Sequence, residues 1–335
     1  MYHMRVFLPL TLIILFAVSP PQAVAADYTF TRIDIPFAGA LDMVLSGINN
    51  RGQIVGWYQD ADGVLHGFLI DEGIVRKIDV PFAGVRFTQV VGINDRSEIS
   101  GLFGDATGNH GFLDKQGHFS AFDVPFAGAF ATQAAGINTR EQIVGNWLIS
   151  GLVSHGFLNN RGTFISIDVP FAGVTGSTAY GINDREQIVG NYNDATHPGP
   201  RGFLDDRGRF ISIDAPFAGV FTTEATGIND REQIVGTYGD ATGDHGFIYR
   251  RGHFSSINVP GAVDTLTSGI NDRGQIVGTY VDANFLQIHG FLADPVCNHE
   301  EETDDCDHEE EIDNHSRAEL GLGDETGLPS LALED

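Results

Sequence analysis

The sequence predicts an all-β fold: a closed six-bladed β-propeller with four strands in each blade. One motif recurs six times at intervals of 42 to 46 residues, each copy holds several short strand patterns, and the two ends of the repeat region are complementary fragments. A period of this length with several strands per unit is typical of propeller blades. No helical periodicity of 3.6 residues is sustained over three turns, so we expect no long helix.

A Gly-Ile-Asn triplet marks each copy of the repeat. Its asparagines are Asn49, Asn94, Asn138, Asn183, Asn229 and Asn271, which are 45, 44, 45, 46 and 42 residues apart. Each triplet is followed by a polar turn, an Ile-x-Gly run, a His-Gly-Phe triplet and an Ile-Asp-x-Pro-Phe-Ala-Gly segment. Arg201 replaces the histidine in the fourth copy, and the crossover into the sixth copy has Pro260-Gly261-Ala262 without the phenylalanine.

The fifth copy shows the expected strands most clearly. We predict strands over residues 223–228, 233–238, 245–249 and 254–259. They are rich in β-branched and aromatic residues, and the turns between them carry Asn, Asp and Gly. The second strand is apolar at neighbouring positions, which predicts a sheet covered on both faces by adjacent blades.

The ends of the repeat region predict a closed ring. Residues 28–34 match the fourth strand of a repeat but have no first three strands before them, and residues 289–292 match a third strand with no fourth after it. Pairing these two segments would complete the sixth blade and remove the free sheet edges.

The chain begins with a predicted signal peptide, residues 1–26. Arg5 precedes an apolar run over residues 6–18, and Ala23-Val24-Ala25 offers the small residues required for cleavage. The run is shorter than the roughly 20 residues of a spanning helix. We therefore expect no membrane span in the mature chain and a secreted or periplasmic protein. Residues 27–295 should form the propeller, as a monomer.

The remaining segment, residues 296–335, is predicted to be a disordered acidic tail. It holds 15 acidic residues and one basic residue, and it carries more than half of the net charge of −26. Such a chain repels phosphate backbones, so nucleic acid is excluded as an expected partner.

The tail also contains the only two cysteines of the chain. Zinc could be held by Cys297, His299, Cys306 and His308. In an exported chain, Cys297 and Cys306 can instead form a disulfide, which we favour because the Cys-x-His spacing is unusual for structural zinc. No cofactor is expected in the repeat body, although calcium at the loops that follow the second strands is an alternative.

The sequence of the repeat unit is similar to the repeat of a known protein family. The unit Gly-Ile-Asn-Asp-x-x-Gln-Ile-Val-Gly, followed by His-Gly-Phe-Leu, resembles the HAF-repeat family of extracellular repeat proteins, named for a His-Ala-Phe triplet at the position of His-Gly-Phe here. The resemblance covers residues 28–294 and recurs six times. It implies an exported bacterial protein with a propeller-like body, and it brings no catalytic residues.

Most of the repeated polar residues are interpreted as structural. The histidine of His-Gly-Phe should pack and hydrogen-bond within each blade, because Arg201 replaces it without other change. The aspartate of Ile-Asp-x-Pro should cap its own turn. Loops such as Asp60-Ala61-Asp62-Gly63 are similar to calcium loops, but one or two carboxylates per loop are too few for a calcium ion, and ordinary turns are favoured.

A binding face is predicted where the crossovers between blades meet the loops between second and third strands. Each of five crossovers carries a phenylalanine of Pro-Phe-Ala-Gly, which either wedges between blades, as the repetition favours, or contacts a ligand. Departures from the repeat in the loops add further apolar residues. The candidates for this face are Phe37, Phe82, Phe126, Phe171, Phe217, Trp147, Leu148 and Phe285.

Together these observations favour an exported, non-catalytic binding or scaffold propeller for a protein or glycan outside the cytoplasm. No Gly-x-Ser-x-Gly, His-Glu-x-x-His or P-loop motif occurs, so no catalytic residue is assigned. The first alternative is an enzyme of lactonase or lyase type with a metal-dependent site at the channel mouth, for which the non-repetitive candidates are Asp60, Asp62, His197 and Asp282. The second alternative is loose metal binding by the tail.

Overall fold

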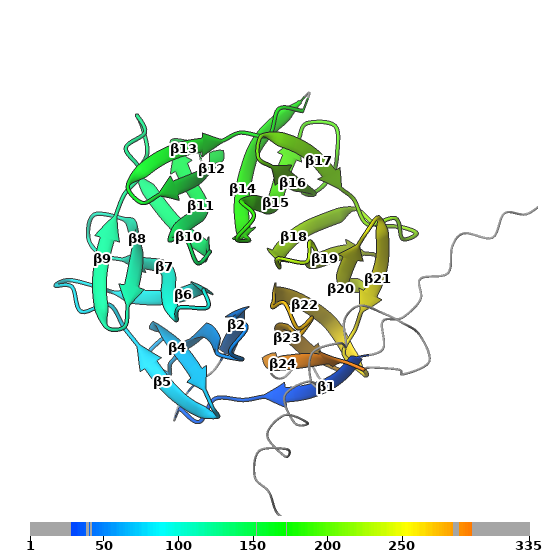
Figure 1. Cartoon of the computed structure of the whole chain (residues 1–335), viewed down its shortest axis with the longest axis horizontal. Coiled ribbons are helices and arrows are strands. Elements are labelled where there is room, and N and C mark those ends of the chain that lie inside the picture. The colour runs from blue at the N-terminus through cyan, green and yellow to red at the C-terminus, as the bar shows by residue number, and fades with distance from the viewer. Residues whose placement is uncertain are drawn as a thin grey trace, which may run out of the picture.

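Six four-stranded antiparallel sheets are arranged as the blades of a ring around a central axis (Figure 1). The computed structural model describes residues 28–37, 40, 42–151, 153–171, 173–283 and 288–296. The described part consists of strands and the loops between them, with no helix. The predicted six-bladed propeller is confirmed.

In each blade the strands are named a to d from the axis outward. Blade 1 contains β2 (Asp42–Ile48), β3 (Ile54–Gln59), β4 (Leu65–Asp71) and β5 (Ile74–Ile78); blade 2 contains β6 (Phe87–Ile93), β7 (Glu98–Gly104), β8 (Asn109–Lys115) and β9 (His118–Phe122); blade 3 contains β10 (Ala131–Ile137), β11 (Gln142–Ile149), β12 (Val153–Asn160) and β13 (Thr163–Ile167).

The second half of the ring follows the same order. Blade 4 contains β14 (Val174–Ile182), β15 (Gln187–Asp194), β16 (Arg201–Asp206) and β17 (Arg209–Ile213); blade 5 contains β18 (Thr222–Ile228), β19 (Ile234–Asp240), β20 (Gly243–Arg250) and β21 (His253–Ile257); blade 6 contains β22 (Ala262–Ile270), β23 (Ile276–Asp282), β24 (Ile288–Pro295) and β1 (Tyr28–Ile33).

Blade 6 is completed by the two ends of the repeat region, as predicted. β1 pairs antiparallel with β24 in a register that joins Tyr28 to Pro295 and Ile33 to Gly290. This pairing supplies the fourth strand of the blade and covers the edge that β24 would otherwise expose.

The predicted strands of blade 5 agree with the observed ones within two residues at each end, apart from one turn. The strands predicted over residues 233–238 and 245–249 left six residues between them, but Asp240 pairs with Gly243 and only two residues connect the observed strands. Gly243 has a φ of 143°, a conformation that glycine adopts without strain. The strands therefore extend further toward the loop than composition suggested.

The core lies between blades and is built from the same repeat positions each time. Its centre is the phenylalanine of the His-Gly-Phe position, which is at most 1% exposed in all six blades: Phe68, Phe112, Phe157, Phe203, Phe247 and Phe291. Burying each ring stabilises the fold by about 1.5 to 3 kcal/mol. A glycine on strand b makes room for it: a Cβ on Gly145 would lie 2.1 Å from the oxygen of Gln133 and 2.8 Å from the Phe157 ring.

Several sequence predictions lie outside the described residues. They are the signal peptide (1–26), the tail beyond Val296, and the candidates Phe285, Cys297, His299, Cys306 and His308. Within the ranges given above, the structure has no helix long and apolar enough to span a bilayer.

Candidate functional site

The propeller has two different ends. We call the end that carries the a–b turns after each Gly-Ile-Asn triplet the Asn face, and the end that carries the b–c loops and the crossovers between blades the crossover face. A cavity of about 80 Å³ opens along the axis at the Asn face, and one of about 200 Å³ lies on the crossover side. Both are lined by residues of the innermost strands and their turns.

Between the two cavities the inner strands approach closely at a collar of six glycines. A Cβ on Gly136 would lie 2.6 Å from the main-chain oxygen of Tyr180 and 3.1 Å from the Cα of Gly181, both in the next blade. The collar consists of Gly47, Gly92, Gly136, Gly181, Gly227 and Gly269. The triplet glycine is therefore required for the close approach of the strands, and it narrows the channel at this level.

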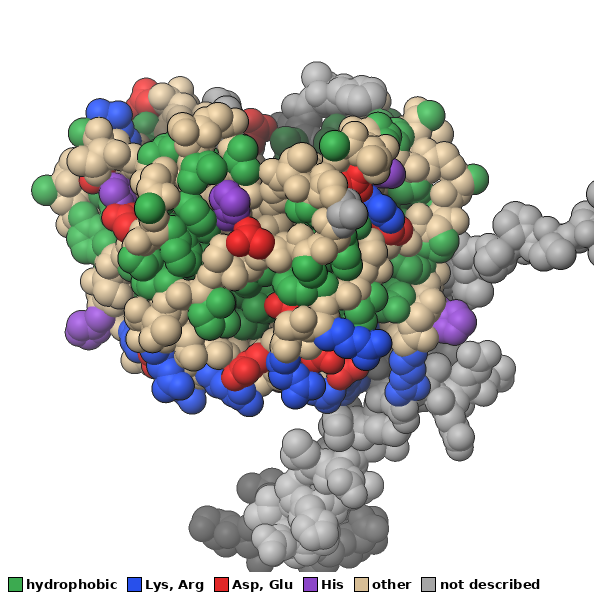
Figure 2. Space-filling view, turned by 90° about the horizontal axis from the view of Figure 1, so that it is seen from above, with side chains coloured by type: hydrophobic (Ala, Val, Ile, Leu, Met, Phe, Trp, Pro, Cys, Tyr) green, Lys and Arg blue, Asp and Glu red, His purple; other side chains and the backbone are tan. Residues whose placement is uncertain are grey.

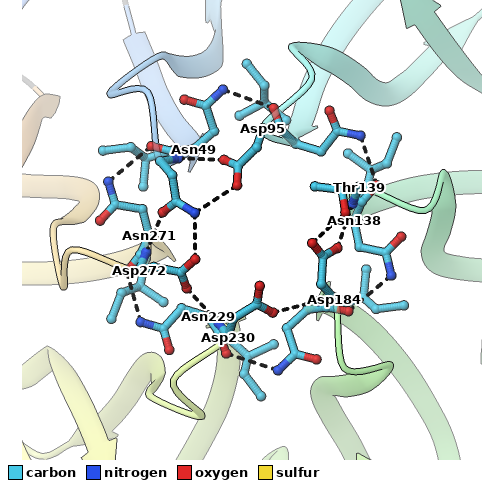
Figure 3. Close-up of a pocket in the computed structure, with 18 residues that line it drawn as sticks. Asn49, Asp95, Asn138, Thr139, Asp184, Asn229, Asp230, Asn271 and Asp272 are labelled. Carbon is cyan, nitrogen blue, oxygen red and sulfur yellow. Dashed lines mark hydrogen bonds between the residues drawn. The ribbon is translucent and has the colours of Figure 1, made fainter.

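Directly below the collar, the triplet asparagines form a closed belt (Figure 3). The Nδ2 of each asparagine donates to the main-chain oxygen of the equivalent asparagine in the next blade, at 2.9 to 3.1 Å. The Oδ1 accepts from its own turn, as Asn138 does from the N–H groups of Arg140 and Gln142 at 3.0 Å. The last bond runs from Asn271 to Asn49, so the belt closes the ring.

A second ring lies at the mouth of the Asn face (Figure 3). It consists of the residues after the belt asparagines: Asn50, Asp95, Thr139, Asp184, Asp230 and Asp272. The N–H of Asp184 donates to Asp230 and that of Asp230 donates to Asp272, both at 2.8 Å. Burial and the charges of its two neighbours raise the pKa of Asp230. These carboxylates therefore serve as acceptors that join one blade to the next.

Arginines surround this mouth. Figure 2 shows Lys and Arg side chains gathered along one edge of the disc. Each Asn turn carries one arginine: Arg51, Arg96, Arg140, Arg185, Arg231 and Arg273. Arg140 donates to Glu186 at 2.7 Å and Arg185 to Glu232 at 2.8 Å, each in the next blade. Exposed pairs of this kind contribute about 1 kcal/mol or less, so they support the belt without dominating it.

On the crossover side, the repeated histidine contacts a carboxylate after strand d and one in the b–c loop. We call this group of side chains in each blade the pin. In blade 1, His66 Nδ1 lies 2.9 Å from Asp79 after strand d, and Nε2 lies 3.0 Å from Asp60 in the b–c loop. In blade 4, Arg201 donates to Asp214 in the same way. The structural interpretation of the histidine fits this geometry. The aspartates, which were expected to cap their own turns, instead accept hydrogen bonds from these side chains.

In the pin of blade 2, the contacts between the side chains change the pKa values of His110 and Asp105. Burial disfavours charge on His110, but the carboxylates of Asp123 and Asp105 outweigh it and raise the pKa of the imidazole. Asp105 accepts hydrogen bonds from the Thr107 hydroxyl and N–H as well as from His110, which lowers its pKa to about 2. The histidine and its two carboxylates therefore favour the charged pair.

The b–c loops considered for calcium are turns closed by their own aspartates. Asp60 accepts from the N–H groups of Asp62 and Val64 at 2.9 Å, and Asp105 accepts from the N–H of Thr107 at 2.6 Å. Throughout the described residues, no group of three or more His, Cys, Asp or Glu side chains is arranged to hold a metal ion. The four candidates for a metal-dependent enzyme lie in blades 1, 4 and 6.

The five crossover phenylalanines are half-buried and pack against an aromatic ring on strand b. Phe37 stacks on Tyr58 with ring centroids 4.8 Å apart, and Phe217 lies 4.6 Å from Tyr238. Phe82, Phe126 and Phe171 make the equivalent contacts with Phe103, Trp147 and Tyr192. This packing is the wedge that the repetition favoured, and none of the five lines the two cavities.

The structure also places the b–c loop candidates of blade 3. Trp147 is only 7% exposed and stacks on His155 at 4.7 Å, so its ring lies inside the blade rather than on the surface. Leu148 is half-buried on β11. Two other aromatic side chains on the crossover face are much more exposed: Phe130 at 50% and Phe221 at 44%. They follow the crossovers into blades 3 and 5, on either side of blade 4.

The cavity on the crossover side has two unlike walls. Hydroxyl-bearing side chains of four successive blades line one wall, namely Tyr180, Thr226, Ser268 and Ser46, whereas Val91 faces the channel from blade 2. Composition did not indicate these residues. A position-by-position alignment of the repeats would have, because Tyr180 stands where the other blades have Ser, Val, Ala, Thr and Ser.

A blade-specific polar group extends this wall outward. Glu224 lies two residues before Thr226 on β18. Asn191 of β15 donates to the Tyr180 hydroxyl at 3.3 Å and hydrogen-bonds Glu224. Burial is the main cause that raises the pKa of both Tyr180 and Glu224. The three residues join blades 4 and 5 behind the channel wall, which only Tyr180 lines.

Comparison with known proteins supports the fold. No protein-family model matches the sequence, and no curated protein matches it significantly. Among solved structures, TolB from Acinetobacter baumannii superimposes with a TM-score of 0.52 at 10% identity, over 72% of this chain and 63% of TolB. A mutant of AofleA from Arthrobotrys oligospora gives 0.50 at 11% identity over 79% and 86% of the two chains, and the Hadza microbial sialidase Hz136 gives 0.50 at 8% over 77% and 66%. At these identities the chain is similar to them in its propeller fold alone.

Proposed function

We propose that this protein is an exported, non-catalytic binding propeller that holds a protein or glycan at the crossover face. The observation that carries the proposal is the division of roles between repeated and unrepeated residues. The repeated glycines, asparagines and histidines are engaged within the ring itself, in the collar, the belt and the pins. On the crossover side, several residues depart from the repeat, among them Phe130, Tyr180 and Phe221 at blades 3, 4 and 5.

Two kinds of departure are suited to binding. Phe130 and Phe221 expose large aromatic surfaces on the crossover face, where burial against a partner would contribute binding free energy. The hydroxyl wall and the group formed by Tyr180, Asn191 and Glu224 supply hydrogen-bonding groups at the channel between them. A partly apolar recess with a few polar groups is the usual character of a ligand site.

The test is binding of a glycan array and of extracellular proteins to the mature body, with two matched double variants. F130S/F221S removes the exposed rings of the crossover face, and I74S/I165S removes two equally exposed side chains of the outer strands. We expect the first pair to weaken binding by about tenfold or more and the second to leave it unchanged. Binding that survives F130S/F221S, or that is lost in I74S/I165S, would place the contact elsewhere.

A further inference from the structure

The crossover-side cavity is more specialised than a general contact surface. Its floor is the glycine collar, and its volume of about 200 Å³ is below the 300 to 1,000 Å³ of sites for drug-sized molecules. It can therefore accept one small unit or the end of a longer molecule. The residues that line the cavity indicate which chemical groups such a unit must carry.

One wall of the cavity presents hydroxyl groups with free hydrogen-bonding capacity. Thr226 Oγ1 donates to the oxygen of Thr267 at 2.8 Å, which leaves its lone pairs as acceptors. Within the described part of the chain, the hydroxyls of Ser46 and Ser268 have no hydrogen-bond partner although both side chains line the cavity. Hydroxyls both donate and accept, so this wall suits a ligand that does the same.

The group next to it adds an acceptor of a different kind. The Glu224 carboxylate hydrogen-bonds the Asn191 amide and has no basic partner among the described residues. In this arrangement the carboxylate accepts from the Asn191 amide and fixes its orientation. Asn191 in turn donates to Tyr180, whose own hydroxyl remains able to donate.

We infer that this cavity binds a neutral polyhydroxylated unit, such as the terminal monosaccharide of a glycan, with Tyr180 as a specificity-determining residue of its wall and with Asn191 and Glu224 positioning the Tyr180 hydroxyl. The hydroxyl wall would contact the edge of the unit, and Val91 with the glycine backbone would contact its apolar face. A cationic amine fits less well, because no carboxylate belongs to the lining of the cavity. The inference rests on the proposed binding function and names its ligand class.

The test uses a panel of neutral monosaccharides and, as a separate probe, n-butylamine, with binding followed by saturation-transfer NMR and titration calorimetry. Y180F removes one hydroxyl and E224Q removes one charge, and neither changes the size of the side chain. We expect at least one monosaccharide to bind with a Kd of about 10 mM or tighter and each variant to weaken it about tenfold. The control is Gln89→Ala, which occupies the Glu224 level in blade 2, and its Kd should stay within about twofold. The melting temperature of each variant checks folding.

The outcomes separate this inference from the proposed function. Saccharide binding that is unchanged in both Y180F and E224Q overturns the assignment of these residues, and binding of n-butylamine alone overturns the ligand class. If no monosaccharide binds but a partner is captured and then lost in F130S/F221S, the cavity inference fails while the proposed function stands. If neither occurs, both fail.

Discussion

The Asn face and the crossover face differ in how far the six blades are alike. Contacts between blades recur around the ring at the Asn face, whereas the channel wall at the crossover face varies from blade to blade. At the Asn face each blade presents the same glycine and asparagine to the next, and the residues that vary there, such as Thr139 in place of an aspartate, still join neighbouring blades. At the crossover face the pins are repeated, but the channel wall changes from Val91 in blade 2 to Tyr180 in blade 4.

The difference shows where selectivity can arise in a repeat protein. A ring closes only if every interface has the same geometry, so residues at the narrowest level are constrained in all six blades. Farther from the collar the channel widens, and one blade can carry a larger or more polar side chain without disturbing its neighbours. Substitutions on the two faces should therefore have different consequences, which the following experiments examine.

The largest effect is expected at the collar. G136A places a Cβ 2.6 Å from the main-chain oxygen of Tyr180, and the backbone of the next blade cannot move away without opening the ring. We expect a loss of about 3 kcal/mol or more in the free energy of unfolding, measured by urea denaturation. The control is Gly117→Ala, which has a φ of 90° and no atom within 4 Å of its Cβ, and should cost about 1 to 2 kcal/mol. Equal losses would show that the collar is not tightly packed.

The belt should give the next largest effect. N138A removes the donor to the main-chain oxygen of Asn183 and the acceptor for two N–H groups. The bonds to Asn183 and from Gln142 are buried, and the bond from Arg140 is partly buried. We expect a loss of about 3 kcal/mol because these groups stay buried without partners. The matched control is Asn160→Ala, at the c–d turn of the same blade, which should change stability by about 0.5 kcal/mol or less. A similar loss in both variants would mean that the belt adds no stability of its own.

The pin of blade 2 should produce a smaller effect that depends on pH. The pKa of His110 is raised above its ordinary value of 6.5, so its pairing stabilises the folded state below that pH, and this stabilisation is lost as the pH rises through the raised pKa. Asp105 acts in the opposite range: its contribution is present above pH 3.8 and is lost as the pH falls toward about 2.

Melting temperatures of the natural protein and of H110Q, measured from about pH 5 to about pH 8, test the histidine. We expect the natural protein to lose stability relative to H110Q as the pH rises across this range. Parallel curves for the two proteins would contradict a role for the charged pair at the crossover face.

Much of the fold could be predicted from the sequence because propeller blades are local units. The four strands of blade 5 follow from turn residues and apolar runs within about 45 residues, and the closure follows from the fragment at residues 28–34 and its counterpart at 289–292. The wedge position of the crossover phenylalanines was favoured for the same reason, since every crossover fills the same gap. The pairing of β1 with β24 needed only complementarity of the two fragments.

By itself, the sequence thus determined the all-β fold, the number of blades and the way in which the ring closes. Only the tertiary structure decided what the Gly-Ile-Asn triplet does, because the partner of each belt asparagine lies 42 to 46 residues away in the next blade, or 222 residues away at the closure. The tertiary structure also connected Tyr180 and Glu224 through Asn191 and placed Trp147 in the core. A linear pattern shows which residues repeat, but the curvature of the ring decides which of them meet at its axis.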